Sequence, residues 1–399
     1  MPINSSQIAL ISRRPAVERG SSGSESRCLE RVSRVMNSIT LLKVLIAAFV
    51  LSSVLLILSS IWRHSLKSVN RKRLTIDFYL NQQFKKPANS VFFMKTHKTA
   101  GSAIQNIMLR RALTNNLSVA IGEGKDWSRL CFSQHFSRDC PSNRHHAPFD
   151  MIAHHLRFNW TELRAVMKPG SVYITIIRDP AALVQSAYYY FGWAEYLSEP
   201  DFSNFIQHYS SYKFNRKIQL PYRNLMMYDL GLNVDQFENI TAIRRKVAEV
   251  EDAFSLVMMF EYFHESLVLM KYLLNWSYED VACFSINTVS RQPNKALSRD
   301  ASDQLIKYNR ADYMLYKHLK AIFFEHLRAF GHDRMAKEVE DLKQTIHEID
   351  RRCSSPMLRP NIPDKLWQQT CKYMSEDEIT LSRRILEREK TGTRVTITH

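Results

Sequence analysis

The sequence contains little glycine: 10 of its 399 residues. Glycine-rich nucleotide folds need this residue at fixed positions, where the backbone must turn tightly and approach a phosphate. The turn that leads to Gly101 has Thr96 where the first glycine of a Walker motif would stand. The sequence therefore argues against a glycine-rich nucleotide fold and disfavours a magnesium–nucleotide kinase.

Runs of basic residues are absent as well, although Lys and Arg number 55 against 39 Asp and Glu, a net charge of +16. Scattered positive charge weakens the case for nucleic acid as a partner. The excess still indicates an anionic partner, such as a membrane surface or a ligand that carries phosphate or sulfate. A convincing metal site is also missing, because His145 with His146 and His154 with His155 are only adjacent pairs.

One long apolar segment is present, "VLIAAFVLSSVLLILSSIW" at residues 44–62, with no charge in 19 positions. As a helix it would span about 28 Å, roughly the hydrocarbon core of a bilayer. Trp62 stands at its end, where interfacial aromatics are common. A buried core helix is the alternative, but a cleavable signal peptide would be shorter and closer to the start. We expect a single membrane anchor.

Flanking charges do not orient this anchor, because basic residues are about equally frequent on both sides. Glycosylation sequons and five of the six cysteines all follow it, which favours a lumenal C-terminal part in a type II membrane protein of the secretory pathway. The sequons are Asn116, Asn159, Asn239 and Asn275.

Disulfides are permitted in that compartment. Cys131 with Cys140, and Cys353 with Cys371, are the pairs nearest in sequence, although spacing does not fix the connectivity. Because five is odd, we expect one thiol to stay free.

The organisation predicted is a cytosolic tail at 1–43, the transmembrane anchor at 44–62, a lumenal stem at 63–88 and a globular domain at 89–399. Within that domain the apolar runs "SVFFM", "FDMIA", "SVYITII" and "FSLVMMFE" are each followed by helical periodicity. Alternation of this kind predicts an α/β fold, a parallel sheet covered by helices on both faces. Beyond residue 297 the pattern is helical.

Two motifs stand at expected strand ends, where open parallel sheets bind ligands. The first is "KTHKTAGS" at 95–102, with Gly101 and Ser102 at the start of a helix that would attract an anion. The second is "IIRDPAALVQSAYYY", in which Asp179 is suited to cap a helix, Arg178 stands at the strand tip and Ser186 follows in the helix. The alternatives are a solvated basic turn and an arginine that pairs with a carboxylate.

Together with "HHLRF", "YDLGL" and "FEYFHESLVLMKYLL", these motifs resemble the galactose-3-O-sulfotransferase family over residues 91–342, in the same order. The resemblance implies a P-loop-like sulfotransferase fold in a Golgi membrane protein. It also implies transfer of a sulfuryl group from 3′-phosphoadenosine 5′-phosphosulfate to the 3-hydroxyl of a terminal β-galactose, on a glycolipid such as galactosylceramide or on a glycoprotein. Lysine and arginine would neutralise the charge, so no metal is required.

The resemblance also assigns residues to roles. Lys98 would stand at the bridging oxygen of the leaving phosphate. Thr99, Gly101 and Ser102 would form the cradle of the 5′-phosphate. Within the same turn we also expect Lys95, through its charge, and Thr96 to bind the cofactor. Arg178 and Ser186 would bind the 3′-phosphate, and Arg291 and Lys295 would close over the nucleotide.

A base for the sugar hydroxyl is needed. The two histidines follow the "FDMIA" strand and should point to opposite sides, and we favour His155 over His154 because related sulfotransferases place a histidine base near this strand end. His97 is the third candidate, and both members of the pair being structural is the alternative. Glu261 is a weaker candidate, and Glu265 fits a helix start. We expect the aromatic side chains Phe158, Tyr188, Tyr189, Tyr190 and Trp193 to belong to the core more than to a sugar site.

Two rival functions stay open: a non-catalytic lumenal protein that binds sulfated glycans, and a sulfotransferase of the same fold that acts on a glycosaminoglycan.

Overall fold

The computed structural model describes residues 41–43, 45–56, 58–59, 86–122, 127–217, 219–284, 297–354 and 365–391. The chain divides into two units, Met1–Lys72 and Arg73–His399. The described residues of the first unit are helical, and their apolar side chains are exposed, Phe49 by 73%. Within these ranges we find no helix with the length and apolar character needed to cross a membrane. Val44, Ile57 and residues 60–62 of the expected anchor lie outside them.

A parallel sheet organises the second unit. Its strands are β1 (Val91–Met94), β2 (Met151–Ile152), β3 (Val172–Ile177) and β6 (Leu256–Met259), in the order β2-β1-β3-β6. All three pairings are parallel, with Val91 opposite both Met151 and Val172. These strands confirm the prediction of a parallel sheet, and each of the four apolar runs supplies one strand. The "FDMIA" run forms only two strand residues, which pair with β1, and on its other side Met151 forms a single bridge with Val119.

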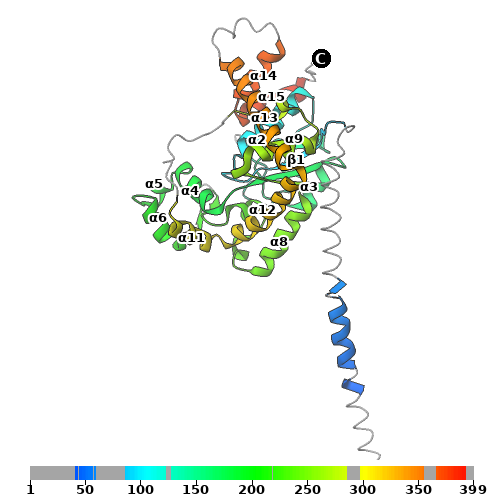
Figure 1. Ribbon diagram of the computed structural model, residues 1–399, viewed down its shortest axis with the longest axis vertical. Helices are drawn as coiled ribbons and strands as arrows, with labels where there is room; N and C mark the ends of the chain where they lie inside the picture. Colours follow the sequence, from blue (N-terminus) through cyan, green and yellow to red (C-terminus); the bar gives the residue numbers. More distant parts are fainter. Residues whose placement is uncertain are drawn as a thin grey trace, which may run out of the picture. The chain divides into compact units, whose positions relative to one another are not determined.

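Helices flank the sheet. In Figure 1, α2 (Gly101–Thr114), α9 (Phe263–Leu274) and α13 (His332–Ser354) lie on one side of β1, and α8 (Ile240–Ala253) and α12 (Arg310–Phe330) on the other. The remaining helices include α3 (Trp160–Val166), α4 (Pro180–Tyr190), α5 (Trp193–Leu197), α6 (Phe202–His208), α7 (Leu225–Asp229), α10 (Tyr278–Val281) and α11 (Arg299–Tyr308). A separate antiparallel pair joins β4 (Phe214–Asn215) and β5 (Leu220–Pro221).

Two further helices, α14 (Lys365–Ser375) and α15 (Glu378–Thr391), lie beyond residue 297, where the sequence predicted helical structure. Helix α15 packs on α2 and buries Leu381 and Ile385 in the main core. Helix α2 begins within the motif at 95–102, so α15 supports the candidate site by packing on α2.

The aromatic residues considered above mostly belong to the core, as expected. Phe158, Tyr188 and Trp193 are at most 2% exposed, whereas Tyr190 is 47% exposed. Tyr189 is half-buried and packs on Phe202.

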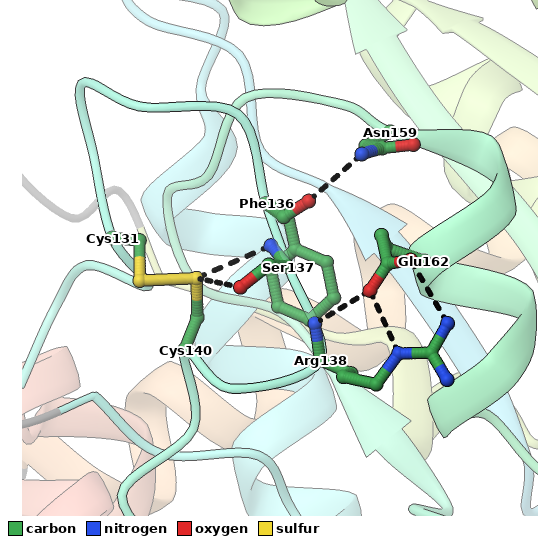
Figure 2. The surroundings of a disulfide bond; sticks show 7 residues. All are labelled: Cys131, Phe136, Ser137, Arg138, Cys140, Asn159 and Glu162. Carbon is green, nitrogen blue, oxygen red and sulfur yellow. Dashed lines mark hydrogen bonds and ion pairs between the residues drawn. A yellow bond between two sulfur atoms is a disulfide. The ribbon is translucent and has the colours of Figure 1, made fainter.

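Both sequence-near disulfides are present, Cys131–Cys140 and Cys353–Cys371, and Cys283 is a buried free thiol. Figure 2 shows the first of them closing a short loop, which an ion pair between Arg138 and Glu162 ties to α3.

Candidate active site

The turn after β1 is shaped to surround a ligand. Lys98 and Ala100 both have left-handed backbone conformations, with φ of 62° and 64°, and such strain in non-glycine residues is typical of functional turns. Helix α2 then begins at Gly101, and no side chain caps its N-terminus. A Cβ atom at Gly101 would lie 2.8 Å from the Cγ of Lys95, so this position needs glycine. The N–H of Ala103 donates to the carbonyl of Ala100 at 3.1 Å, and the N–H groups of Gly101 and Ser102 precede it at the helix start, where backbone N–H groups bind anions.

Two residues assigned to the cradle have other partners. The Lys95 ammonium is 3% exposed and donates to Gln105 Oε1 and Glu378 Oε2, both at 2.6 Å. The Thr96 hydroxyl donates to the carbonyl of Ile176 at 2.6 Å, which ties the turn to β3. Lys95 and Thr96 therefore stabilise the turn from inside, and their contact with a phosphate stays a prediction.

Arg178 reaches the same turn from the end of β3. Its Nη1 donates to the carbonyl of Lys98 at 3.1 Å, and its guanidinium lies 4.0 Å from the ring centre of Phe260. Its Nε is buried and has no hydrogen-bond partner in the part of the chain that the structure describes. A buried N–H without an acceptor is costly, and an anionic oxygen would satisfy it.

The helix after Arg178 begins as predicted. Asp179 caps α4 by accepting from the N–H groups of Ala181 and Ala182, both at 3.0 Å, and Pro180 is its first residue. Glu261, a weaker candidate for the base, accepts from the backbone N–H of Asp179 at 2.7 Å and from Tyr316. That geometry gives Glu261 a role in holding the strand ends together.

Lys98 lies above an exposed aromatic ring. Its Nζ is 3.3 Å from the ring centre of Tyr190. Burial, with the nearby charges of Arg178 and Lys95, lowers the pKa of Lys98 to about 8. A crowded group of cations of this kind is stabilised when an anion enters.

His97 has a partner that the sequence did not reveal. Asp229, which is fully buried at the end of α7, accepts from the backbone N–H of His97 at 2.7 Å. Its carboxylate also lies 2.9 Å from His97 Nδ1. A carboxylate on Nδ1 holds the imidazole so that Nε2 is free to accept a proton. Asp229 belongs to the "YDLGL" motif, which we singled out in the sequence without giving this aspartate a role.

The histidines after β2 point to opposite sides, as expected of adjacent residues. His154 is fully buried, its Nε2 lies 2.8 Å from the hydroxyl of Ser382 on α15, and burial lowers its pKa to about 4. The ring of His155 instead stacks on His97, with centres 4.1 Å apart. Burial, with the neighbouring His97, keeps the pKa of His155 well below its usual value.

The remaining candidates are placed less directly. Ser186 is buried in α4, and the Ser102 hydroxyl donates to Glu378 at 3.3 Å. Arg291 and Lys295 lie outside the described residues. No group of three potential metal ligands comes together in the described ranges.

A cavity of about 1320 Å³ adjoins this turn. Its wall includes Ala100 and Ala103 from the start of α2 and Phe260 beside Arg178. Farther out it is lined by α13 and α14, with Lys343 and Lys372. The cavity thus opens onto the turn at 95–102, and the two lysines add positive charge to its wall.

An open parallel sheet, a helix N-terminus without a side-chain cap and a buried arginine N–H without an acceptor at neighbouring strand ends are typical of α/β proteins that bind anionic ligands. Comparison with known proteins makes this class specific. The family model of galactose-3-O-sulfotransferase matches residues 26–363, and the chain belongs to this family.

Curated relatives agree. Galactosylceramide sulfotransferase of Mus musculus is 35% identical over 282 residues, which is 67% of this chain and 64% of the mouse protein. Galactose-3-O-sulfotransferase 3 of Bos taurus is 34% identical over 288 residues, 68% of this chain and 66% of the bovine one. Galactose-3-O-sulfotransferase 2 of Sus scrofa is 31% identical over 301 residues, 70% of this chain and 73% of the pig protein. The chain spans slightly less than two thirds of the mouse relative.

Proposed function

We propose that the protein is a sulfotransferase that moves a sulfuryl group from 3′-phosphoadenosine 5′-phosphosulfate to the 3-hydroxyl of a terminal β-galactose. The observation that carries this proposal is the meeting of Arg178 with the turn at 95–102, where a buried N–H lacks an acceptor. Membership of the family supports the reaction class. The name of the mouse relative favours a galactolipid acceptor, and the names of the other two specify galactose alone.

The residues present fit such a nucleotide. The first turn of α2 and Lys98 would hold the 5′-phosphosulfate, and Arg178 would bind the 3′-phosphate, with Ser186 as its expected companion. The adjoining cavity would take the adenosine. When bound, the donor supplies the sulfuryl group and a phosphate leaving group. Positive charge from Lys98 would stabilise the negative charge that develops on the leaving oxygen.

The base that removes the proton of the sugar hydroxyl is best assigned to His97. Asp229 orients the ring of His97 and stabilises it when it gains a proton. His155, which we favoured from the sequence, lies behind that ring and its pKa is low, so it is a poorer proton acceptor. His154 is the weakest candidate of the three, since it is fully buried and its Nε2 lies 2.8 Å from the hydroxyl of Ser382.

Nucleotide binding tests the proposal directly. Calorimetry with adenosine 3′,5′-bisphosphate on the full chain in detergent should show binding, and Arg178→Ala should weaken it about 10- to 150-fold, because a charge-assisted contact contributes ~1.5–3 kcal/mol. Arg138→Ala is the matched control, since Arg138 is 57% exposed and pairs with Glu162. A chain that binds sulfated glycans but no nucleotide would support the non-catalytic rival. A chain that transfers labelled sulfate to glycosaminoglycans but not to galactosides would support the rival sulfotransferase that acts on a glycosaminoglycan.

We further propose a type II arrangement in the Golgi membrane, with residues 44–62 as the anchor and the second unit in the lumen. The exposed apolar side chains of the first unit, the four sequons and the two disulfides support it. Asn116 and Asn239 are exposed, whereas the amide of Asn159 donates to the carbonyl of Phe136 (Figure 2). Peptide-N-glycosidase should therefore increase gel mobility. Digestion of the C-terminal part by protease added to intact vesicles would contradict the arrangement.

A further inference from the structure

A line of aromatic rings runs from the candidate base toward the surface. The ring of Phe132 lies 5.2 Å from that of His97, Tyr228 follows at 6.1 Å from Phe132, and Phe214 at 6.2 Å from Tyr228. We call Phe132, Tyr228 and Phe214 the aromatic row. Its members come from three separate parts of the chain, so no local sequence pattern produces it.

The two ends of the aromatic row are accessible. Phe132 is half-buried, and Phe214 is 38% exposed. Tyr228 between them is only 4% exposed, and the guanidinium of Arg157 lies 4.0 Å from its ring centre. Tyr228 is thus a structural link, whereas Phe132 and Phe214 present apolar surface to solvent.

Phe132 is held firmly in place. It follows Cys131 in the loop that the Cys131–Cys140 disulfide closes. Two contacts tie this loop to the start of α3: Arg138 with Glu162, and the Phe136 carbonyl with the amide of Asn159 (Figure 2). A ring fixed in this way loses little conformational freedom when it contacts a ligand.

Tyr190 is the other exposed ring beside the turn, but its face is already covered. The Lys98 ammonium lies 3.3 Å from its centre. A cation on an aromatic face leaves no room for a sugar on the same face. Two half-buried rings lie beside His97, Phe132 with its centre 5.2 Å away and Phe191 with its centre 6.3 Å away, and Phe132 is the nearer. The guanidinium of Arg129 is 5.6 Å from the centre of Phe132, farther than Lys98 is from Tyr190.

We propose that Phe132 is the platform on which the acceptor galactose stacks, and that Phe214 contacts an apolar group attached to that galactose. The inference rests on the proposed function. One face of β-galactose carries C–H groups, and these match the electron-rich face of an aromatic ring. A sugar on Phe132 would lie next to His97, which is where its hydroxyl must be to lose a proton.

Substitutions by leucine test this, because leucine keeps apolar packing and removes the ring. With saturating donor, Phe132→Leu should increase KM for methyl β-galactoside about tenfold and change kcat less than about twofold. Phe132→Tyr should restore KM, since it keeps the ring. The affinity for adenosine 3′,5′-bisphosphate should be the same in all three proteins.

Phe214→Leu separates the outer contact from the inner one. It should increase KM for octyl β-galactoside severalfold and leave KM for methyl β-galactoside unchanged. Lactose carries a polar sugar where octyl β-galactoside carries an apolar chain. If Phe214→Leu increased KM equally for both acceptors, the assignment of Phe214 to an apolar group would be overturned. Tyr313→Leu, at a ring of 36% exposure on α12, is the control and should change neither KM.

Failure of this inference differs from failure of the proposed function. Wild-type activity on galactosides with an unchanged KM in Phe132→Leu would overturn the platform alone. If kcat or nucleotide affinity collapsed in Phe132→Leu and Phe132→Tyr did not restore KM, Phe132 would have a packing role and the platform would be wrong. A wild-type protein that binds the nucleotide but sulfates no galactoside would overturn both.

Discussion

Replacement of Asp229 by asparagine is the sharpest test of the candidate site. The side chain is fully buried and contacts both the backbone N–H and the Nδ1 of His97. Asparagine keeps the shape but removes the charge, and its amide group would oppose one of these donors. General base catalysis contributes about 100- to 10,000-fold, so the loss of the charged partner that orients His97 predicts a decrease in kcat within that range.

The assay measures turnover with the phosphosulfate donor and a galactoside, together with nucleotide affinity. Because Asp229 acts through His97, the double variant with His97→Ala should be no slower than His97→Ala alone. Nucleotide affinity should stay within about twofold, since the side chains of His97 and Asp229 are not among the groups that we expect to contact the phosphates. Asp280→Asn, which removes a partner of Arg111 away from the site, should leave turnover unchanged.

Two results would refute this reasoning. Near-normal turnover in Asp229→Asn would show that the orientation of His97 does not matter to the reaction. Multiplicative effects in the double variant would show that the two residues act independently, and His155→Ala would then be the variant to compare.

Other predictions concern charge. Because burial and neighbouring cations lower the pKa of Lys98 to about 8, nucleotide affinity should fall as pH rises through about 8, and Lys98→Arg should remove this fall; a flat wild-type profile in calorimetry would contradict it. Burial raises the pKa of Asp312 to about 7, so between about pH 4 and 7 the folded protein keeps a proton on this carboxyl that the unfolded chain has lost. Thermal stability should therefore decrease as pH rises from about 4 to 7 in wild type, and should decrease less in Asp312→Asn. Glu378→Gln leaves the nearly buried Lys95 ammonium without its counter-ion and should lower unfolding free energy by ~2–4 kcal/mol, whereas Glu389→Gln on the same helix should cost less.

Much of the fold was predictable because its signals are local. Apolar runs of a few residues, each ended by polar or turn residues, identified the strands, and the chain order of strands and helices implied a parallel sheet. The cap at Asp179 and the first helical residue Pro180 follow from their own conformational preferences. The sequence also predicted that Arg178 and the turn at 95–102 share one edge, because the carboxyl ends of parallel strands meet there.

The tertiary structure alone decided which neighbours these residues have. Sequence chemistry made Lys95 a phosphate ligand, yet Glu378, which lies 283 residues later, takes its ammonium. From the sequence we favoured His155 as the base, and the sequence did not indicate that its ring stacks on His97. Asp229 contacts His97 although the two residues are 132 positions apart in the sequence. A residue type and its local periodicity determine what a side chain is able to bind. Which group it meets depends on long-range packing, here of α7 and α15 against the turn after β1, and no local pattern encodes that contact.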